Sequence, residues 1–244
     1  MSQTKIHVII PAAGKGERMG GDIPKVLLKI DGIPVVIRTL QAFDRMAMET
    51  GVSVSSVVVA SPGLIPVISS LAEEYGITTL SGVIEGGATR TGSVYNGVRY
   101  LELSGIEPDS YVFVHDGARC LVDMDTLTCC LEGVRSHEVC VASVPVKNTL
   151  KICQKDADGS MKVVSTPDRD NIREVQTPQC FRADVIIKSY ENAIKNGITA
   201  TDDTALAEIL GYEVFLTEGS YSNIKITTQE DIPLAEEIIR RRAY

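Results

Sequence analysis

The feature that most constrains the fold is the alternation of short apolar runs with segments of helical periodicity. Runs such as VVVA at 57–60 and YVFV at 111–114 do not alternate between polar and apolar residues. An apolar run of this length without alternation is typical of a strand that is covered on both faces. A chain that repeats strand and helix in this way forms a mostly parallel sheet with helices on both sides. We therefore predict an α/β fold of Rossmann-like architecture.

The same pattern predicts where the elements lie. We expect strands at 5–10, 55–60, 78–83, 111–116, 139–146 and 213–219, and helices from about residue 35, over 64–76, after residue 89, over 124–135, from residue 183, over 204–210 and from residue 229. With 244 residues and 44% hydrophobic content, the chain can bury one sizeable core, so we predict a single domain spanning 1–244. Ligands of such sheets bind beyond the carboxyl ends of the strands.

Residues 147–177 interrupt this rhythm. Two short β-prone runs flank the sequence Asp156-Ala157-Asp158-Gly159, and the Asp-Gly pair favours a tight reversal of the chain. The segment therefore predicts a β-hairpin that protrudes as an arm. A two-stranded ribbon is only marginally stable in water, so we expect the arm to pack against the parent domain or a second subunit.

Composition excludes several classes of protein. The chain has 24 Lys and Arg against 32 Asp and Glu, a net charge of −8, and no Trp, which argues against a surface for nucleic acid. The first apolar run ends at Pro11, too early for a signal peptide or a membrane span, so we expect a cytoplasmic protein. The six cysteines form no C-x-x-C pair and the three histidines are not grouped with them, which predicts reduced thiols and no protein-bound metal.

The loop PAAGKGERMGGDIPK at 11–25, directly after the first strand, has the composition of a phosphate-binding loop. Glycines let backbone N–H groups approach phosphate oxygens, and Lys15, Arg18 and Lys25 supply positive charge. The string G-x-x-x-x-G-K-[ST] of a P-loop is absent. The spacing G-x-G-x-x-x-G, with no acidic residue ending the next strand, disfavours a dinucleotide-binding dehydrogenase. A glycine-rich turn without a ligand remains the third alternative.

Five motifs in order resemble the methylerythritol phosphate cytidylyltransferase family of the non-mevalonate isoprenoid pathway. They are GKGERMGGDIPK, HDGAR at 115–119, TPQ at 177–179, TDD at 201–203 and NIKIT at 223–227. The resemblance covers nearly the whole chain and implies a nucleotidyltransferase fold. It implies in-line attack by the phosphate of 2-C-methyl-D-erythritol 4-phosphate on the α-phosphate of CTP, with release of pyrophosphate. A ribitol phosphate cytidylyltransferase and a non-catalytic nucleotide-sensing subunit remain as alternatives.

The resemblance also implies roles for individual residues. Arg18 and Lys25 are expected to stabilise charge on the α-phosphate in the transition state, and Lys225 to reach the phosphates as a third catalytic cation. Asp116 is expected to hold substrate hydroxyls, with Arg119 in the same motif. The remaining nucleotide contacts expected from the resemblance are Pro11, Ala12, Ala13, Gly14, Lys15, Gly16, Gly87, Ala88, Arg90, Ser93, Asp116 and Gly117.

Recognition of cytosine is expected at Gly86 to Ser93, where Ala88 replaces an acidic residue that is frequent in the family and leaves the backbone to contact the base. Two smaller departures from the family pattern are Cys120 and Val26. Arg169, Thr177 and Thr201 are expected to bind the sugar phosphate, the arginine coming from the arm of a second subunit. A homodimer with shared sites follows. Mg²⁺ is expected as a cofactor held mainly by CTP oxygens and water, with no protein ligand.

Overall fold

The computed structural model describes residues 4–14 and 23–242. Within these residues a seven-stranded sheet runs in the order β11-β7-β10-β6-β1-β4-β5. Its strands are β1 (Lys5–Pro11), β4 (Ser53–Ala60), β5 (Leu80–Glu85), β6 (Tyr111–Val114), β7 (Val139–Pro145), β10 (Arg173–Arg182) and β11 (Phe215–Glu218). Every neighbouring pair is parallel except the two that involve β10, which runs against both β6 and β7. The predicted mostly parallel α/β fold is therefore confirmed.

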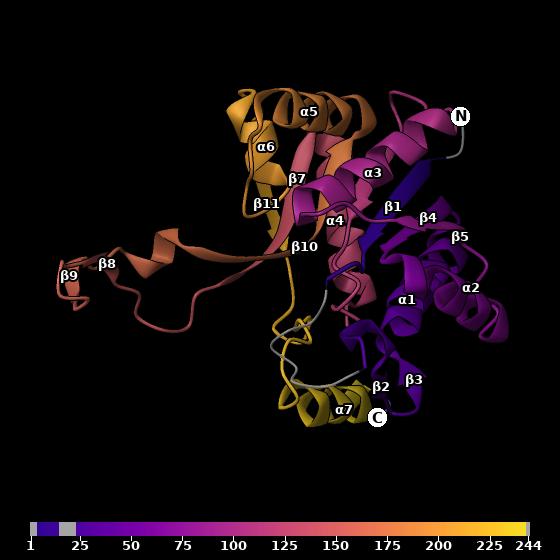
Figure 1. The fold of residues 1–244 in the computed structure, drawn as a ribbon, viewed down its shortest axis with the longest axis horizontal. Helices are drawn as coiled ribbons and strands as arrows, with labels where there is room; N and C mark the ends of the chain where they lie inside the picture. Colours follow the sequence, from indigo (N-terminus) through magenta and orange to yellow (C-terminus); the bar gives the residue numbers. More distant parts are fainter. Residues whose placement is uncertain (1–3, 15–22, 243–244) are drawn as a thin grey trace.

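Helices cover both faces of this sheet (Figure 1). They are α1 (Val35–Thr50), α2 (Ile65–Glu74), α3 (Arg90–Leu103), α4 (Met124–Ser136), α5 (Ala183–Asn196), α6 (Thr204–Ile209) and α7 (Asp231–Arg242). Along β1, Val8 and Ile10 pack with α1, α2 and α4, whereas Ile9 packs with α3, α5 and α6. Because side chains alternate between the faces of a strand, an unalternated apolar run supplies both cores at once.

Side chains with hydrogen-bonding groups fix where two helices begin. The hydroxyl of Thr89 accepts a hydrogen bond from the N–H of Gly92 at the start of α3, and the carboxylate of Asp123 accepts one from Thr126 at the start of α4. Such bonds satisfy N–H groups that lack a partner in the first turn of a helix. The predicted start of a helix after Thr89 is confirmed.

A small subdomain lies below the sheet in the view of Figure 1. The short hairpin of β2 (Lys29–Ile30) and β3 (Ile33–Pro34) packs there with α7, around the buried residues Ile30, Ile226 and Ala235. Sequence analysis placed only a loop at β2 and β3. Each of these strands has two residues, which is too short to leave a periodic pattern.

The arm leaves the body of the molecule as a long projection that ends in β8 (Ile152–Lys155) and β9 (Met161–Ser165) (Figure 1). The predicted reversal lies between them, and Gly159 has a φ of 89°, a left-handed conformation that glycine adopts without strain. All nine residues of these two strands are exposed. The predicted hairpin is therefore confirmed at the Asp-Gly pair, and its strands bury no side chains within the described structure.

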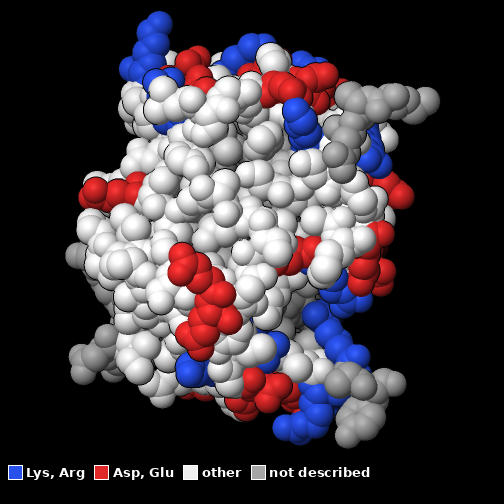
Figure 2. Space-filling view, turned by 90° about the vertical axis from the view of Figure 1, so that its right-hand side faces the viewer, with Lys and Arg blue, Asp and Glu red and all other residues white. Residues whose placement is uncertain are grey.

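The edge strand β5 and the helix α2 lie on the side of the molecule away from the arm (Figure 1). Figure 2 shows this side: Lys and Arg side chains lie mainly toward its upper and lower ends, with Asp and Glu side chains among them. The described residues therefore form no continuous basic surface on this side. None of the helices in 4–14 and 23–242 combines the length and the apolar character needed to cross a membrane.

Candidate active site

A cleft of about 1260 Å³ opens at the carboxyl ends of β1, β4, β5 and β6. Its lining comes from the loops that follow these strands and from the segment that precedes α7. The lining residues are Pro11, Ala12, Ala13, Gly14, Pro24, Lys25, Ser61, Pro62, Leu64, Gly86, Gly87, Ala88, Thr89, Arg90, Ser93, Asp116, Gly117, Ala118, Lys225 and Thr227. Carboxyl ends of parallel strands are where open α/β sheets bind ligands, so this cleft is the candidate active site.

Backbone hydrogen bonds between the strand ends build one wall of the cleft. The N–H of Ala12 donates to the carbonyl of Val59 at 2.7 Å, and the N–H of Gly86 donates to that of Ala60 at 2.8 Å. A Cβ on Gly86 would lie 2.6 Å from the Cβ of Ala13, closer than real carbon atoms approach. Glycine is therefore required where the loop after β5 crosses the loop after β1.

The loop that leads into α3 is closed by Ser93. The N–H of Gly87 donates to the Ser93 hydroxyl at 3.1 Å, and that hydroxyl donates to the carbonyl of Thr89 at 2.9 Å. A Cβ on Gly87 would lie 2.7 Å from the backbone of Gly92, so no larger residue fits. The loop brings the first turn of α3, with its positive dipole end, to the edge of the cleft.

Asp116 lies at the centre of the charges in the cleft, two residues beyond the end of β6. Its carboxylate is 2.8 Å from the Nζ of Lys225, 3.5 Å from the Nε of Arg119 and 3.7 Å from the Nη2 of Arg90. Burial would raise the pKa of Asp116, but the nearby charges of Lys225, Arg90 and Arg119 outweigh it and lower the pKa to about 2. Asp116 is therefore ionised at neutral pH.

The NIKIT segment reaches the cleft because its backbone is tied to the loop after β6. The N–H of Ile226 donates to the carbonyl of Ala118 at 2.9 Å, and Arg119 donates to the carbonyl of Asn223 at 2.8 Å. Asn223 is fully buried and donates to the carbonyl of Thr177 at 2.8 Å. These bonds fix Lys225 against Asp116. Sequence analysis described this segment without a regular element, and the structure has neither a strand nor a helix there.

Thr177 supports Asp116 from β10. Its hydroxyl accepts a hydrogen bond from the N–H of Asp116 at 3.1 Å and bonds to the Nδ1 of His115 at 3.0 Å. The other ring nitrogen of His115 lies 3.0 Å from the carbonyl of Arg119. A carbonyl only accepts, so that nitrogen carries the proton and the Thr177 hydroxyl donates to Nδ1. The single hydrogen of this hydroxyl is thus engaged within the protein, and the role of Thr177 in binding a sugar phosphate stays a prediction.

The structure brings together twelve of the residues expected from sequence. They are Pro11, Ala12, Ala13, Gly14, Lys25, Gly87, Ala88, Arg90, Ser93, Asp116, Gly117 and Lys225. Arg119 and Thr177 lie behind Asp116, and Thr201 is exposed just before α6. Arg169 is exposed in the short helix Arg169–Asn171 of the arm and does not line the cleft. Lys15, Gly16 and Arg18 lie outside the described residues.

Sequence reasoning missed Ser61, Pro62 and Leu64, which follow β4, and Thr227, which follows Lys225. A signal was present for the first three, because they come directly after an apolar strand and parallel strands end at the same edge of a sheet. Thr227 carried no such signal.

The described residues offer positive charge and backbone N–H groups rather than metal ligands. Asp116 is the one carboxylate among the described lining residues of the cleft, and it is already paired with Lys225. Nowhere in 4–14 and 23–242 do three His, Cys, Asp or Glu side chains gather so that they could hold a metal ion. A phosphate-rich anion therefore fits this cleft better than a metal ion bound by protein ligands alone.

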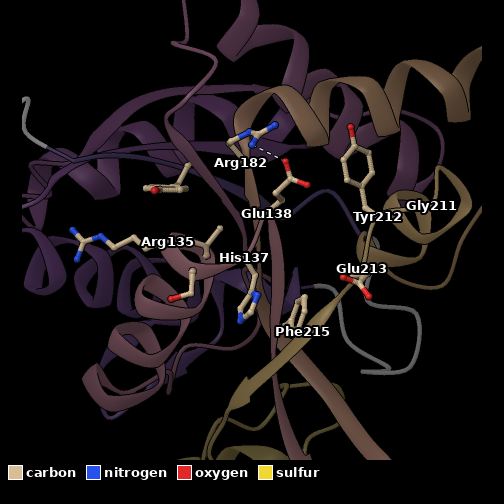
Figure 3. A pocket seen from close by; sticks show the side chains of 11 residues that line it. Arg135, His137, Glu138, Arg182, Gly211, Tyr212, Glu213 and Phe215 are labelled. Atoms are coloured by element: carbon tan, nitrogen blue, oxygen red, sulfur yellow. Dashed lines mark ion pairs between the residues drawn. The ribbon is translucent and has the colours of Figure 1, made fainter.

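A second hollow, of about 560 Å³, lies near the opposite ends of the strands and contains none of the expected site residues. Its lining includes Arg182, which pairs with Glu138 at 2.6 Å, and His137, whose ring stacks on that of Phe215 with centroids 3.5 Å apart (Figure 3). Arg182 and His137 are thus engaged with neighbouring side chains of the same hollow. Because the expected site residues line the cleft at the carboxyl ends instead, that cleft remains the candidate active site.

Comparison with known proteins agrees with this geometry. The family model IspD: 2-C-methyl-D-erythritol 4-phosphate cytidylyltransferase matches residues 6–241. The chain is similar to a 2-C-methyl-D-erythritol 4-phosphate cytidylyltransferase of Alkaliphilus oremlandii, with 39% identity over 98% of this chain and 97% of the relative. It is also similar to one of Synechococcus sp., with 38% identity over 97% of this chain and 98% of the relative.

Two solved structures have the same fold. The crystal structure of 4-diphosphocytidyl-2C-methyl-D-erythritol synthase from Anaerococcus prevotii superposes with a TM-score of 0.79 and 28% identity, over 97% of this chain and 99% of the other. The Francisella tularensis 2-C-methyl-D-erythritol 4-phosphate cytidylyltransferase superposes with a TM-score of 0.76 and 30% identity, over 96% and 99%. The loops at the carboxyl ends, the cations around Asp116 and these matches lead to one conclusion: the chain belongs to the 2-C-methyl-D-erythritol 4-phosphate cytidylyltransferase family.

Proposed function

We propose that this enzyme transfers CMP from CTP to the phosphate of 2-C-methyl-D-erythritol 4-phosphate and releases pyrophosphate. The observation that carries the proposal is the cleft at the carboxyl ends of the sheet, where Lys25 and Lys225 lie with the glycine-rich loops after β1 and β5. Two anionic substrates have to meet in such a reaction. Fixed cations in a partly enclosed site stabilise the charge that develops as they do.

The acceptor phosphate attacks the α-phosphorus of CTP, a new P–O bond forms, and the bond to the pyrophosphate leaving group breaks. Lys25 and Lys225 are proposed to stabilise charge on the α-phosphate, together with Arg18. Asp116, ionised and fixed by the N–H bond to Thr177, is proposed to accept hydrogen bonds from hydroxyls of the acceptor. The backbone around Gly87 and Ala88 is proposed to contact the cytosine.

Mg²⁺ is proposed to be held by phosphate oxygens of CTP and by water, because the described lining of the cleft supplies a single carboxylate that is paired with Lys225. When bound, the ion would offset the repulsion between the two anionic substrates. The protein's own part is to orient the phosphates and to supply the remaining positive charge.

A homodimer with shared sites is proposed on the basis of the arm. Ile152, Met161, Val163 and Val164 are each more than half exposed on β8 and β9, which a stable ribbon in water would not leave uncovered. Arg169 lies on the same arm, away from the cleft of its own chain. A second copy of the chain would cover the apolar side chains and receive this arginine at its acceptor site.

The proposed reaction is tested by pyrophosphate release with each of the four nucleoside triphosphates against methylerythritol phosphate and ribitol phosphate, with and without Mg²⁺. We expect turnover with CTP, methylerythritol phosphate and Mg²⁺. Lys25→Ala is expected to abolish it, whereas Lys29→Ala, an exposed lysine on β2, serves as the matched control and should retain it. Turnover only with ribitol phosphate would refute the acceptor, and normal turnover of Lys25→Ala would refute the mechanism.

Shared sites are tested by mixing two inactive variants. Subunits with Arg169→Ala and subunits with Lys25→Ala should recover part of the activity when mixed, because some hybrid sites combine an intact arm with an intact cleft. Absence of recovery, with subunit exchange demonstrated, would rule out a site built from two chains.

A further inference from the structure

A series of paired charged side chains runs from the cleft to the buried carboxylate of Asp203. The guanidinium of Arg90, the first residue of α3, donates to Asp203 twice, from Nη1 to Oδ1 at 2.8 Å and from Nη2 to Oδ2 at 2.7 Å. The same Nη2 lies 3.7 Å from Asp116, and Asp116 pairs with Lys225 at 2.8 Å. Asp203 is therefore the nearer partner of Arg90, and Asp116 is the partner of Lys225.

Asp203 is held in place before any substrate arrives. Its side chain is 1% exposed and does not line the cleft. The hydroxyl of Tyr190 donates to its Oδ1, and the side-chain oxygen of Gln179 accepts the N–H groups of Asp203 and Thr204 at 2.7 and 3.1 Å. A carboxylate fixed on so many sides, and out of contact with the cleft, can influence the reaction only through its partner Arg90.

Arg90 has one other carboxylate within ion-pair distance among the described residues, and that is Asp116. A forked pair with Asp203 satisfies both terminal nitrogens of the guanidinium and draws it away from Asp116. Without the charge of Asp203, the partly exposed guanidinium would turn to Asp116, because this is the other carboxylate within its reach among the described residues. Arg90 lies nearest Oδ1 of Asp116 and Lys225 pairs with Oδ2, so a closer Arg90 would compete with Lys225 for the charge of this carboxylate.

We propose that Asp203 is a positioning residue for the transfer reaction: it retains Arg90 so that the Asp116 carboxylate stays available to Lys225 and to the acceptor hydroxyls. This role rests on the proposed function, in which Lys225 and Asp116 orient the two substrates. Asp203 itself touches no substrate. Its effect is to set which cation Asp116 pairs with.

The test compares steady-state kinetics of three variants, each confirmed as folded by its thermal unfolding. Asp203→Asn is expected to lower kcat/KM for the acceptor by at least tenfold, with most of the loss in kcat and in the KM of the acceptor rather than that of CTP. Adding Arg90→Gln to Asp203→Asn removes the competing cation, so kcat/KM for the acceptor, measured at saturating CTP, should recover at least threefold over Asp203→Asn alone. The KM for CTP should rise in this double variant, because Arg90 is also an expected nucleotide contact that lines the cleft.

Tyr190→Phe is the matched control, because it removes a hydrogen bond to Asp203 and leaves both charges in place. It should stay within threefold of the unaltered enzyme. If Asp203 served only to hold α5 and α6 together, Tyr190→Phe would lose activity as Asp203→Asn does and the double variant would be no better than the single one; either result overturns the proposal.

Two further outcomes are distinguishable. If Asp203→Asn does not fold, the double variant, which buries neither charge, carries the test: a folded double variant with less than a hundredth of normal kcat/KM would refute the proposal. If the unaltered enzyme shows no turnover with CTP and methylerythritol phosphate, it is the proposed function that fails, before Asp203 is examined.

Discussion

The buried imidazole of His115 should make the folded protein sensitive to acid. Its ring is fully buried, with the edge of Phe43 against it at 5.4 Å between centroids. In the neutral ring one nitrogen donates to the carbonyl of Arg119 and the other accepts from the Thr177 hydroxyl, so both ring nitrogens are satisfied without a charge. Burial lowers the pKa of His115 from 6.5 to about 4, and the hydrogen bond to the carbonyl of Arg119 and the charge of Asp116 offset this effect only in part.

The sign and size of the effect follow from this difference. Between pH 6.5 and 4 the unfolded chain binds a proton at His115 and the folded chain does not, so the free energy of unfolding falls as the pH falls. The contribution is fully present above pH 6.5. The pKa difference of 6.5 minus about 4 corresponds to about 3 kcal/mol at roughly 1.4 kcal/mol per pH unit. His7, whose pKa is also lowered by burial, adds a contribution of the same sign.

The assay is urea unfolding at several pH values from 7 to 4.5, at one protein concentration. Wild-type protein should lose stability steadily across this range, whereas His115→Gln should show a markedly flatter dependence even if it is less stable at pH 7. His7→Gln is the matched control and should keep most of the slope, because His7 is only partly buried. Equal slopes for wild type and His115→Gln would refute the reasoning.

Three further predictions concern packing and hydrogen bonding. Gly133→Ala should lower the free energy of unfolding by about 1–3 kcal/mol in urea titrations, because the new Cβ would lie 2.5 Å from Thr217, where α4 packs on β11. Asp44→Asn should cost about 2 kcal/mol in the same assay, since this carboxylate accepts from both the N–H and the hydroxyl of Thr79. Gly87→Ala should raise the KM for CTP at least tenfold in pyrophosphate-release kinetics and also lower the thermal stability, because the new Cβ would lie 2.7 Å from the backbone of Gly92 and the loop at the cleft would have to shift.

Strands β1, β4, β6 and β7 could be predicted because they are largely buried and contain unbroken apolar runs. Strand β10 could not. Its residues include Gln176 and Pro178, which argue against a strand in the middle of a sheet, yet it lies between β6 and β7. The register shifts between Val175 and Gln179, which accommodates the proline at an irregularity. Gln176 is buried because it bonds to Ser220, a partner 44 residues away that no local pattern reveals.

Part of the candidate site could also be predicted from sequence, whereas one of its ion pairs could not. Loops after strands β1, β5 and β6 meet at one edge of the sheet, so residues such as Gly14, Gly87 and Asp116 could be placed together from topology. The pair of Arg90 and Asp203 could not, since 113 residues separate them and the TDD motif contains two aspartates of equal character. Only the closed fold shows that Asp203 is buried, whereas Asp202 is partly exposed.

The local balance of charge explains how an acidic chain can bind a triphosphate. The whole chain has a net charge of −8, which by itself would repel phosphates. At the floor of the cleft, Arg90, Arg119 and Lys225 face Asp116 and Asp203, so three cations against two carboxylates leave one positive charge before Lys25 is added. Charges separated by more than about 8 Å through water are largely screened at physiological salt, so a bound phosphate responds to this local excess rather than to the total. The acidic composition therefore argues against a nucleic-acid surface but is compatible with a small polyanion bound in the cleft.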